Sequence, residues 1–401
     1  MGATSRDGAN VMRTWAKRMG ITALGLGLVA GGAALWKREE IARLMAVNSL
    51  FAPDRIVANF SAMDRAFLSV PVATPGPAWP LPEGPPLALP GGIGAWAEDR
   101  AVTAMVVLDR GALVHEGYRL GTGPDDLRIS WSVAKSVLSL LTGILVAEGA
   151  VALDDPVTRH APILAGSAYD GATLEDVLQM ESGVLFDEDY LDRASDINRM
   201  GRVVALGGTL DGFTAELSER RGEPGADMRY VSMDTHVVGM VLRGATGRDV
   251  PDLLSEKLLA PTGLEGPARF LTDGAGTAFV LGGLNMRTRD YARIGLLVAR
   301  DGRGRDGAQI VPADWIEAST AASARTGPGE MRYGYQWWVP VDARPGEVLA
   351  RGVYGQYVYV DRARDVVVAV NAADRAFREA GRHEVNVAAF RRIADAVAAS
   401  R

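Results

Sequence analysis

Residues 130–151 read SWSVAKSVLSLLTGILVAEGAV, a polar start followed by a largely apolar run at 137–151. Ser132 and Lys135 stand three apart in this stretch. At the start of a helix, such a pair lies on one face, one turn from each other. A nearby amine that accepts the hydroxyl proton turns a serine into an effective nucleophile. The alternative interpretation is a helix-capping Ser130 or Ser132 followed by a solvated lysine.

The rarity of lysine in this chain supports a catalytic role for the Ser132 and Lys135 pair. Only Lys17, Lys37, Lys135 and Lys257 are lysines, and the other members of the 43 Lys+Arg total are arginines. Arginine stays charged in proteins, whereas burial and neighbouring charges can tune the pKa of a lysine. A lysine kept beside a serine in such a chain therefore favours proton-transfer chemistry.

Composition narrows the function classes. The 401 residues are 48% hydrophobic and 23% charged, enough to bury a large core, and the net charge of −6 argues against nucleic acid as a partner. The absence of cysteine excludes a thiol nucleophile and a disulfide framework. No His-Glu-x-x-His or Gly-x-Ser-x-Gly pattern occurs, which argues against a zinc hydrolase and an ordinary α/β-hydrolase.

An N-terminal export or anchoring segment is predicted at residues 19–36, which are uncharged and largely apolar after three basic residues. The alternative is a cleaved signal peptide with its apolar core at 20–29 and small residues at 30–32. Either interpretation places the folded part outside the cytoplasm. We expect a periplasmic or other extracytoplasmic protein, anchored to the inner membrane by residues 19–36.

Four regions are predicted along the chain. They are an anchor or signal segment (1–40), a helical then proline-rich lead segment (41–92), an α/β lobe (93–152 and 266–401) and a mainly helical lobe (153–265). The lead segment should be helical and amphipathic over 41–70, with a break at Pro53. The proline-rich run at 71–90 should then wrap the surface as extended chain, or else form a free linker.

Strand patterns cluster near both ends of the folded part. Expected strands are 103–109 and 112–118 around an Arg110-Gly111 turn, 335–339, and a hairpin of 356–360 with 365–370. Expected helices are 173–180, 236–244, and 383–398, the first two stopped by glycine. We therefore predict an α+β fold, an antiparallel sheet flanked by helices with an inserted mainly helical lobe. A groove between the lobes is the expected place for a site.

Two further motifs follow the serine and lysine. Tyr230-Val231-Ser232 offers a phenol that can relay a proton if a cation lowers its pKa; the alternative is an ordinary core tyrosine. The run at 352–356, GVYGQ, leads into a strand. Its glycines would let the backbone approach a ligand and aim N–H groups at a developing oxyanion; the alternative is a plain strand entry.

In this order and spacing, the three motifs resemble the serine β-lactamase and penicillin-recognising superfamily. The similarity is greatest to its class C-like esterases and amidases, the branch of the 6-aminohexanoate-dimer (nylon oligomer) hydrolases, and covers residue 51 to the C-terminus. Further matching stretches are Asn59–Asp64, Leu178–Gly183, Phe186–Tyr190, Gly282–Asn285 and Tyr333–Trp338. The resemblance implies the β-lactamase/transpeptidase fold and a serine hydrolase.

The resemblance also implies the roles of particular residues. Ser132 would be the nucleophile, and Lys135 and Tyr230 would move its proton. The N–H groups of Ser132 and Val353 would form the oxyanion hole. Substrate-binding positions would be Tyr190, Ser232, Gly352 and Gly355. Neither a metal nor an organic cofactor is expected, and the substrate would be a small ester or amide cleaved through an acyl-serine.

Departures from the family pattern restrict the substrate. Ser232 stands where lactam-active enzymes usually carry asparagine, and the third motif has no lysine to hold a substrate carboxylate, so efficient β-lactam hydrolysis is not expected. The acidic run at 187–189 would attract an amine-bearing substrate or form a solvated loop. Two alternatives stay open: a D-amino-acid peptidase or transpeptidase acting on cell-wall peptides, and a non-catalytic binding relative on the same fold.

Overall fold

The computed structural model describes residues 15, 19 and 35–401. The predicted anchor or signal segment at 19–36 lies almost entirely outside the described residues, and it stays a prediction. Within the described part of the chain, no helix combines the length and the apolar character that crossing a membrane requires.

A seven-stranded antiparallel sheet has the order β3-β2-β11-β10-β9-β8-β7. Its strands are β2 (Val102–Asp109), β3 (Ala112–Tyr118), β7 (Arg332–Tyr333), β8 (Trp338–Val339), β9 (Glu347–Gly352), β10 (Gln356–Asp361) and β11 (Val366–Ala372). Both predicted hairpins are confirmed, since β2 pairs with β3 and β10 with β11. Arg110 and Gly111 in the first turn have φ of 49° and 77°, the conformation that matches the twist of the joined strands.

The strand predicted at 335–339 is confirmed only over its last two residues, where β8 lies. The short strands β7 and β8 form a tight hairpin in which Tyr333 pairs with Trp338. Gln336 lies in the turn with φ 64°, and its amide group donates to the Leu178 carbonyl at 2.8 Å. A contact with the helical region therefore holds this turn. Strand propensity is a property of the local sequence and could not predict that contact.

The alternation of side chains in β11 explains how helices cover both faces of the large sheet. Val367 and Ala369 pack into the cluster that contains α13 (Thr288–Ala299), whereas Val366, Val368 and Val370 pack against α15 (Arg382–Ala399). Successive strand residues point to opposite faces, so the valines of this strand pack against one helix on each face of the sheet. The predicted C-terminal helix is confirmed as α15.

A second, four-stranded antiparallel sheet was not predicted, because the expectation was a single sheet. Its order is β1-β5-β6-β4 and its strands are β1 (Leu68–Val72), β4 (Arg128–Ile129), β5 (Ala268–Thr272) and β6 (Leu284–Met286). β1 falls in a stretch predicted as helix, and it holds Pro71, which an edge strand tolerates. Strands this short show too few residues for a period-two pattern to be recognised.

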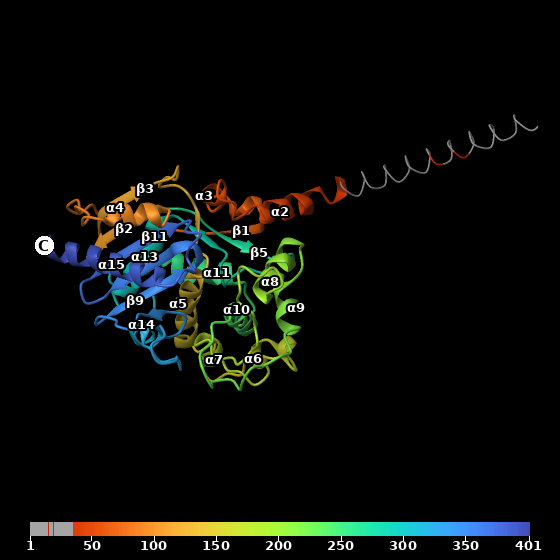
Figure 1. The fold of residues 1–401 in the computed structure, drawn as a ribbon. Coiled ribbons are helices and arrows are strands. Elements are labelled where there is room, and N and C mark those ends of the chain that lie inside the picture. The colour runs from red at the N-terminus through yellow and green to blue at the C-terminus, as the bar shows by residue number, and fades with distance from the viewer. Residues whose placement is uncertain (1–14, 16–18, 20–34) are drawn as a thin grey trace, which may run out of the picture.

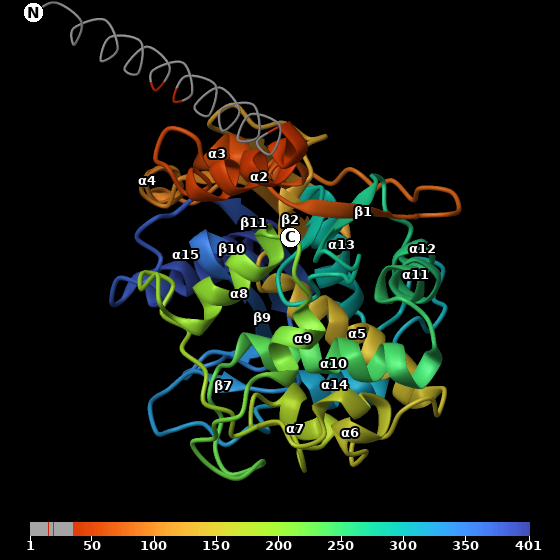
Figure 2. The ribbon, with the colours of Figure 1, turned by 90° about the vertical axis from the view of Figure 1, so that its right-hand side faces the viewer.

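Residues 153–265, all of them described, form helices and loops without a named strand. The helices are α6 (Val157–His160), η2 (Pro162–Leu164), α7 (Leu174–Leu178), α8 (Asp196–Ala205), α9 (Leu210–Ala215), α10 (Ser232–Thr246), α11 (Val250–Leu254), the π-helical turn η3 (Ser255–Leu259) and α12 (Ala260–Thr262). Glycine at 244 does not end α10 as predicted; Gly247, with φ 65°, caps it instead. Helices α6, α7, α9 and α10 gather at one end of the molecule (Figures 1 and 2).

The lead segment is helical at first and then extended. Helices α2 (Arg38–Asn48), α3 (Ile56–Asn59) and η1 (Met63–Arg65) precede β1, and the proline-rich run follows with hardly any regular structure. The backbone N–H of Trp79 donates to the Gly263 carbonyl, and that of Leu87 donates to the Val114 carbonyl. The run therefore wraps the domain as expected and does not behave as a free linker.

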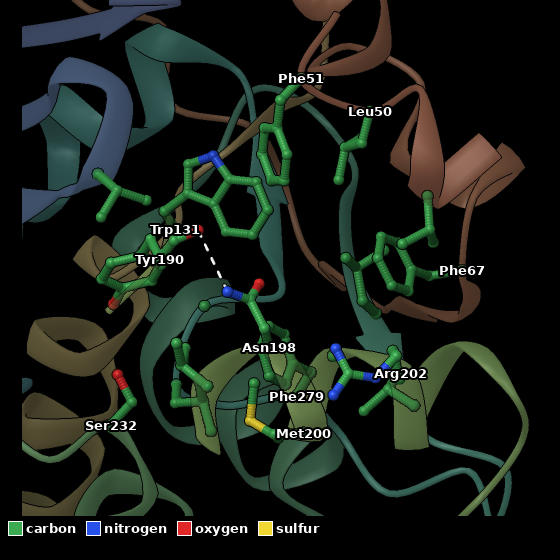
Figure 3. Close-up of a pocket in the computed structure, with 18 of the residues that line it drawn as sticks. Leu50, Phe51, Phe67, Trp131, Tyr190, Asn198, Met200, Arg202, Ser232 and Phe279 are labelled. Atoms are coloured by element: carbon green, nitrogen blue, oxygen red, sulfur yellow. Dashed lines mark hydrogen bonds between the residues drawn. The ribbon is translucent and has the colours of Figure 1, made fainter. Parts of the chain in front are cut away.

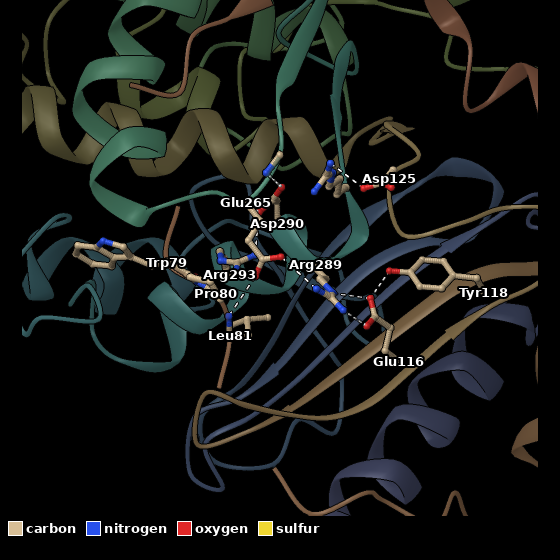
Figure 4. A network of polar contacts seen from close by, with 12 residues as sticks. Trp79, Pro80, Leu81, Glu116, Tyr118, Asp125, Glu265, Arg289, Asp290 and Arg293 are labelled. Carbon is tan, nitrogen blue, oxygen red and sulfur yellow. Dashed lines mark hydrogen bonds and ion pairs between the residues drawn. The ribbon is translucent and has the colours of Figure 1, made fainter. Parts of the chain in front are cut away.

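A buried ionic network also holds this run to the domain (Figure 4). Arg293 of α13 contacts the carboxylates of Asp290 and Glu265, and its guanidinium donates to the Trp79 carbonyl at 2.9 Å. Glu265 accepts a hydrogen bond from the backbone N–H of Leu81 at 3.1 Å. The network thereby joins α13, Glu265 and the proline-rich run, and it places the Arg293 charge against two carboxylates. The remaining helices are α4 (Ile93–Asp99), α5 (Val133–Ala147), η4 (Val353–Gly355) and α14 (Ala313–Thr320).

Candidate active site

Helix α5 carries the serine and the lysine into the interior. It lies between the large sheet and the helical region, with contacts to β9 and α10 (Figure 1). Every residue from Val133 to Leu145 is buried, as expected for a helix that is apolar on most of its faces. Ser132 is the N-cap residue and is 9% exposed. The apolar run therefore places Ser132 where a buried helix meets the cavities described below.

Lys135 is buried without a carboxylate in contact. Its ammonium group donates to the Leu281 carbonyl at 2.7 Å and to the Ser232 hydroxyl at 3.3 Å. No described carboxylate lies within ion-pair distance of it. Burial lowers the pKa of Lys135 to about 7, although Glu188 and Asp234 act in the opposite direction. At neutral pH, a large share of the molecules therefore holds this lysine as a neutral amine that can accept a proton.

Tyr230 and Ser232 reach the site from the start of α10. The Tyr230 ring centroid lies 5.5 Å from the Lys135 ammonium nitrogen, and the ring stacks on Trp338 at 5.5 Å. The pKa of Tyr230 is raised overall, although a cation does act on it in the direction named above. Burial raises that pKa and Glu188 raises it further, whereas hydrogen bonding with Ser132 and the charge of Arg351 offset these two effects only in part. Tyr230 is therefore a protonated phenol at neutral pH, able to donate and relay a proton.

Glu188 is a site residue that sequence reasoning missed. Its carboxylate accepts hydrogen bonds from the backbone N–H of Ser232 and, at 2.8 Å, from the Tyr190 hydroxyl. Burial raises the pKa of Glu188, and the charge of Lys135 lowers it. The acidic run at 187–189 was expected as a solvated loop or as an attractor of amines. The family-like stretch at 186–190 did mark this loop as part of the resemblance. Nothing in its sequence showed that the loop folds back onto α10.

The third motif brings a strand end against Ser132. A Cβ at Gly352 would lie 2.7 Å from the Ser130 carbonyl and 3.1 Å from the Ser132 nitrogen, so only glycine permits this approach. Within the described residues, the N–H groups of Ser132 and Val353 donate to no other group. Gly355, the other predicted glycine, is buried with φ 85°. Two unpaired N–H groups beside one hydroxyl are the arrangement that an oxyanion requires.

Backbone strain flanks both of these N–H groups. Trp131 precedes Ser132 with φ 42°, and Tyr354 follows Val353 with φ 59°, values that non-glycine residues rarely adopt. Phe51 of the lead segment stacks on Tyr354 at 4.9 Å and lies 5.9 Å from the Trp131 ring. The lead segment therefore supports the two strained residues that orient the N–H groups.

Two cavities meet at the serine, and Ser132, Tyr190 and Val353 line both. One cavity of about 680 Å³ is mostly apolar and lies between the lead segment and α8 (Figure 3). The other, of about 490 Å³, is more polar and is lined by Tyr230, Glu188 and residues around the start of α15. A carbonyl carbon at Ser132 can therefore carry one substituent into each cavity. The predicted substrate-binding residues divide between them: Ser232 lines the apolar cavity, Gly352 and Gly355 line the polar one, and Tyr190 lines both.

A metal site has no support in the described part of the chain. No group of three or more His, Asp or Glu side chains lies close enough together there to hold a metal ion. The donors and acceptors at Ser132 are amine, phenol, carboxylate and backbone N–H groups, which suit proton transfer and acyl chemistry.

Known proteins resemble this chain over most of its length. A β-lactamase family model matches residues 94–390. The 6-aminohexanoate-dimer hydrolase of Paenarthrobacter ureafaciens is 32% identical over 285 residues, which cover 68% of this chain and 72% of that relative.

Solved structures share the fold. A Bacillus anthracis protein, provisionally named a 6-aminohexanoate-dimer hydrolase, has a TM-score of 0.75 and 21% identity, covering 86% of this chain and 95% of its own. A D-stereospecific amidohydrolase from Streptomyces has a TM-score of 0.56 and 18% identity, covering 70% of this chain and 94% of its own. The predicted α+β fold is thus confirmed, with two antiparallel sheets where one was expected. The chain belongs to the β-lactamase family, within which its relatives are hydrolases, and it is a serine hydrolase.

Proposed function

We propose that the protein cleaves an ester or amide bond of a small substrate through an acyl-serine at Ser132, in the manner of a 6-aminohexanoate-dimer hydrolase. The observation that carries this proposal is the amine of Lys135, buried without a contacting carboxylate, one helical turn from Ser132. Such an amine reaches its neutral form near pH 7 and can take the proton of the hydroxyl.

The proposed reaction has two steps. In the first, the Ser132 oxygen bonds to the carbonyl carbon while its proton passes to Lys135. The N–H groups of Ser132 and Val353 hold the oxyanion. The bond from the carbonyl carbon to the leaving group then breaks, and the leaving group takes the proton of Lys135 through the Tyr230 phenol, which leaves Lys135 neutral again. In the second, water attacks the acyl-serine, Lys135 takes the proton of that water, and the proton returns to the Ser132 oxygen.

A labelling experiment tests the nucleophile. A fluorophosphonate probe should modify the protein once, at Ser132, and p-nitrophenyl butyrate should be hydrolysed; Ser132→Ala should abolish both. Ser139→Ala is the matched control, because Ser139 lies on the same helix with a buried hydroxyl that has no hydrogen-bond partner. Labelling that persists in Ser132→Ala would refute the assignment. A folded wild type that is neither labelled nor active would favour the non-catalytic binding alternative.

The position of Arg351 supports the D-amino-acid peptidase alternative. It lines the polar cavity beside Gly352, and among the described residues it forms no ion pair. A guanidinium in this position can bind the terminal carboxylate of a peptide, the group for which the third motif lacks a lysine. Arg351→Gln should then impair hydrolysis of acyl-D-alanyl peptides and leave p-nitrophenyl butyrate unaffected. An equal effect on both substrates would remove this alternative.

A further inference from the structure

The apolar cavity beside Ser132 is built largely from carbon. Leu50 and Phe51 of the lead segment form one side, Met200 and Val204 of α8 face them, and Phe279 and Leu281 complete the wall. Figure 3 shows this arrangement around an open centre. A concave, mostly apolar space of about 680 Å³ is of a size that encloses small-molecule ligands. Most of its wall therefore suits an apolar group of a ligand.

Charge in the lining has one sign. Arg193 and Arg202 line the cavity, and no aspartate or glutamate among the residues that the structure describes does so. Both arginines are exposed, and in Figure 3 Arg202 lies on the opposite side of the cavity from Ser232. A ligand with a terminal ammonium group would meet two positive charges and no acceptor of opposite charge. A chain that ends in a methyl group meets no such penalty.

The position of the proton donor indicates which half of a substrate enters. Tyr230 and Glu188 line the polar cavity and are absent from the lining of the apolar one. In the proposed reaction, the leaving group takes its proton from the Tyr230 side, so it occupies the polar cavity. The acyl half is then directed into the apolar cavity.

We propose that the apolar cavity is an acyl-chain site, and that the substrates of this hydrolase carry a medium-length apolar acyl group without positive charge. The proposal rests on the proposed function and names its substrate class. Leu50 and Phe51, which form one side of this site, precede the region that the β-lactamase family model matches, residues 94–390.

A chain-length series measures the site directly. The kcat/KM of wild-type protein is compared for p-nitrophenyl acetate, butyrate and octanoate. Each methylene group that leaves water strengthens binding by about fourfold, so octanoate should exceed butyrate by at least about tenfold. Two further substrates test direction and charge. p-Nitrophenyl 8-aminooctanoate should be at least about tenfold poorer than octanoate, and octyl acetate should gain little over butyl acetate, because its chain lies in the leaving group.

Two variants of α8 should close the cavity. Met200→Trp enlarges a side chain that lines it, and Gly201→Trp adds a ring at a position where a new Cβ meets no atom within 4 Å. If Met200→Trp does not fold, Gly201→Trp still tests the site. Each should lower kcat/KM for octanoate by at least about tenfold and lower kcat/KM for acetate by a much smaller factor, because the acetyl group does not extend to α8. Leu206→Trp is the matched control, because Leu206 caps the same helix, is 56% exposed and does not line the cavity.

The outcomes separate the two proposals. Fluorophosphonate labelling with a flat chain-length profile would overturn the acyl-chain site and leave the proposed function intact. Folded variants that keep the wild-type preference for octanoate, a preference for the 8-amino ester, or a larger gain for octyl acetate would also overturn it. A wild type without labelling or turnover of any ester would overturn the proposed function itself.

Discussion

Lys135 and Arg293 are both almost fully buried cations, at 1% and 3% exposure, yet their surroundings are opposite. Arg293 contacts two carboxylates, Asp290 and Glu265, and a backbone carbonyl (Figure 4). The Lys135 ammonium group donates hydrogen bonds to a carbonyl and a hydroxyl, and no carboxylate of the described residues lies within ion-pair distance of it. One buried charge is fully compensated, and the other is not.

The difference teaches what each site does. A compensated charge stays charged and ties chain segments together, a task that suits the planar, permanently charged guanidinium. An uncompensated amine in the interior loses much of its preference for the charged form, and so it can exchange a proton near neutral pH. The four predictions that follow test this contrast, from the largest expected effect to the smallest.

Replacing the uncompensated amine should abolish turnover. Lys135→Arg keeps the charge but cannot reach a neutral form, so kcat for p-nitrophenyl butyrate should fall by about 10²–10⁴. Lys135→Met, which removes the amine from a similar volume, should lose as much. Thermal melting checks that both variants fold. A Lys135→Arg protein with most of the wild-type kcat would reduce Lys135 to an electrostatic partner and direct attention to Tyr230 as the base.

Breaking the compensated cluster should affect stability and spare the chemistry. Arg293→Met leaves Asp290 and Glu265 buried beside a neutral side chain, which should lower the free energy of unfolding by about 3–5 kcal/mol in urea denaturation. The kcat of the folded fraction should stay near that of the wild type. Arg305→Met is the control, because exposed Arg305 also donates to the proline-rich run, at the Pro80 carbonyl, and it should cost about 0.5 kcal/mol or less. Equal costs for the two variants would contradict the contrast.

Removing the negative charge near Lys135 should shift the pH profile. Glu188 raises the pKa of Lys135 against the effect of burial, so Glu188→Gln should lower that pKa. The proposed base is active when neutral, and kcat/KM should rise with pH through about 7 in the wild type. The acidic limb should therefore move to lower pH in Glu188→Gln. A limb that moves upward would show that Lys135 does not control it; Asp187→Asn, at an exposed neighbouring position, serves as the control.

A smaller effect is expected at Asp234, a buried carboxyl group of α10. It accepts hydrogen bonds from Tyr169 at 2.9 Å and Ser182 at 2.8 Å, and one of its oxygens has no partner. Burial raises its pKa to about 8. Since the folded pKa lies above the unfolded value, the stability linked to this proton is present at acidic pH and is lost as pH rises towards 8.

Asp234→Asn should therefore reduce the fall in Tm of the wild type between pH 5 and pH 8. The measurement is a series of melting curves for both proteins across that range. A wild-type curve that rises with pH, or a variant with the same slope as the wild type, would contradict a neutral Asp234 in the folded protein.

Local patterns in the sequence predicted the long helices and strands of the fold. The apolar run after Ser132 predicted α5, the β-rich runs around Arg110-Gly111 predicted the β2–β3 hairpin, and the valine-rich stretch after the turn at 361–364 predicted β11. Each of these elements is long enough to show its own period. The four-stranded sheet was missed because β4 and β6 are two and three residues long, and their pairing lies in distant segments.

The chemistry of the site divides in the same way. The residue types and spacing of Ser132 and Lys135, and the order of the motifs at Tyr230 and Gly352, are properties of the chain itself. Residues three apart on a helix share one face, so the sequence alone brings this hydroxyl and this amine near each other. The neutral amine at pH 7, the protonated phenol, the placement of Glu188 and the two cavities depend on burial and on segments far apart in sequence. Desolvation and long-range charge exist only once the chain has folded, and for that reason tertiary structure alone decided them.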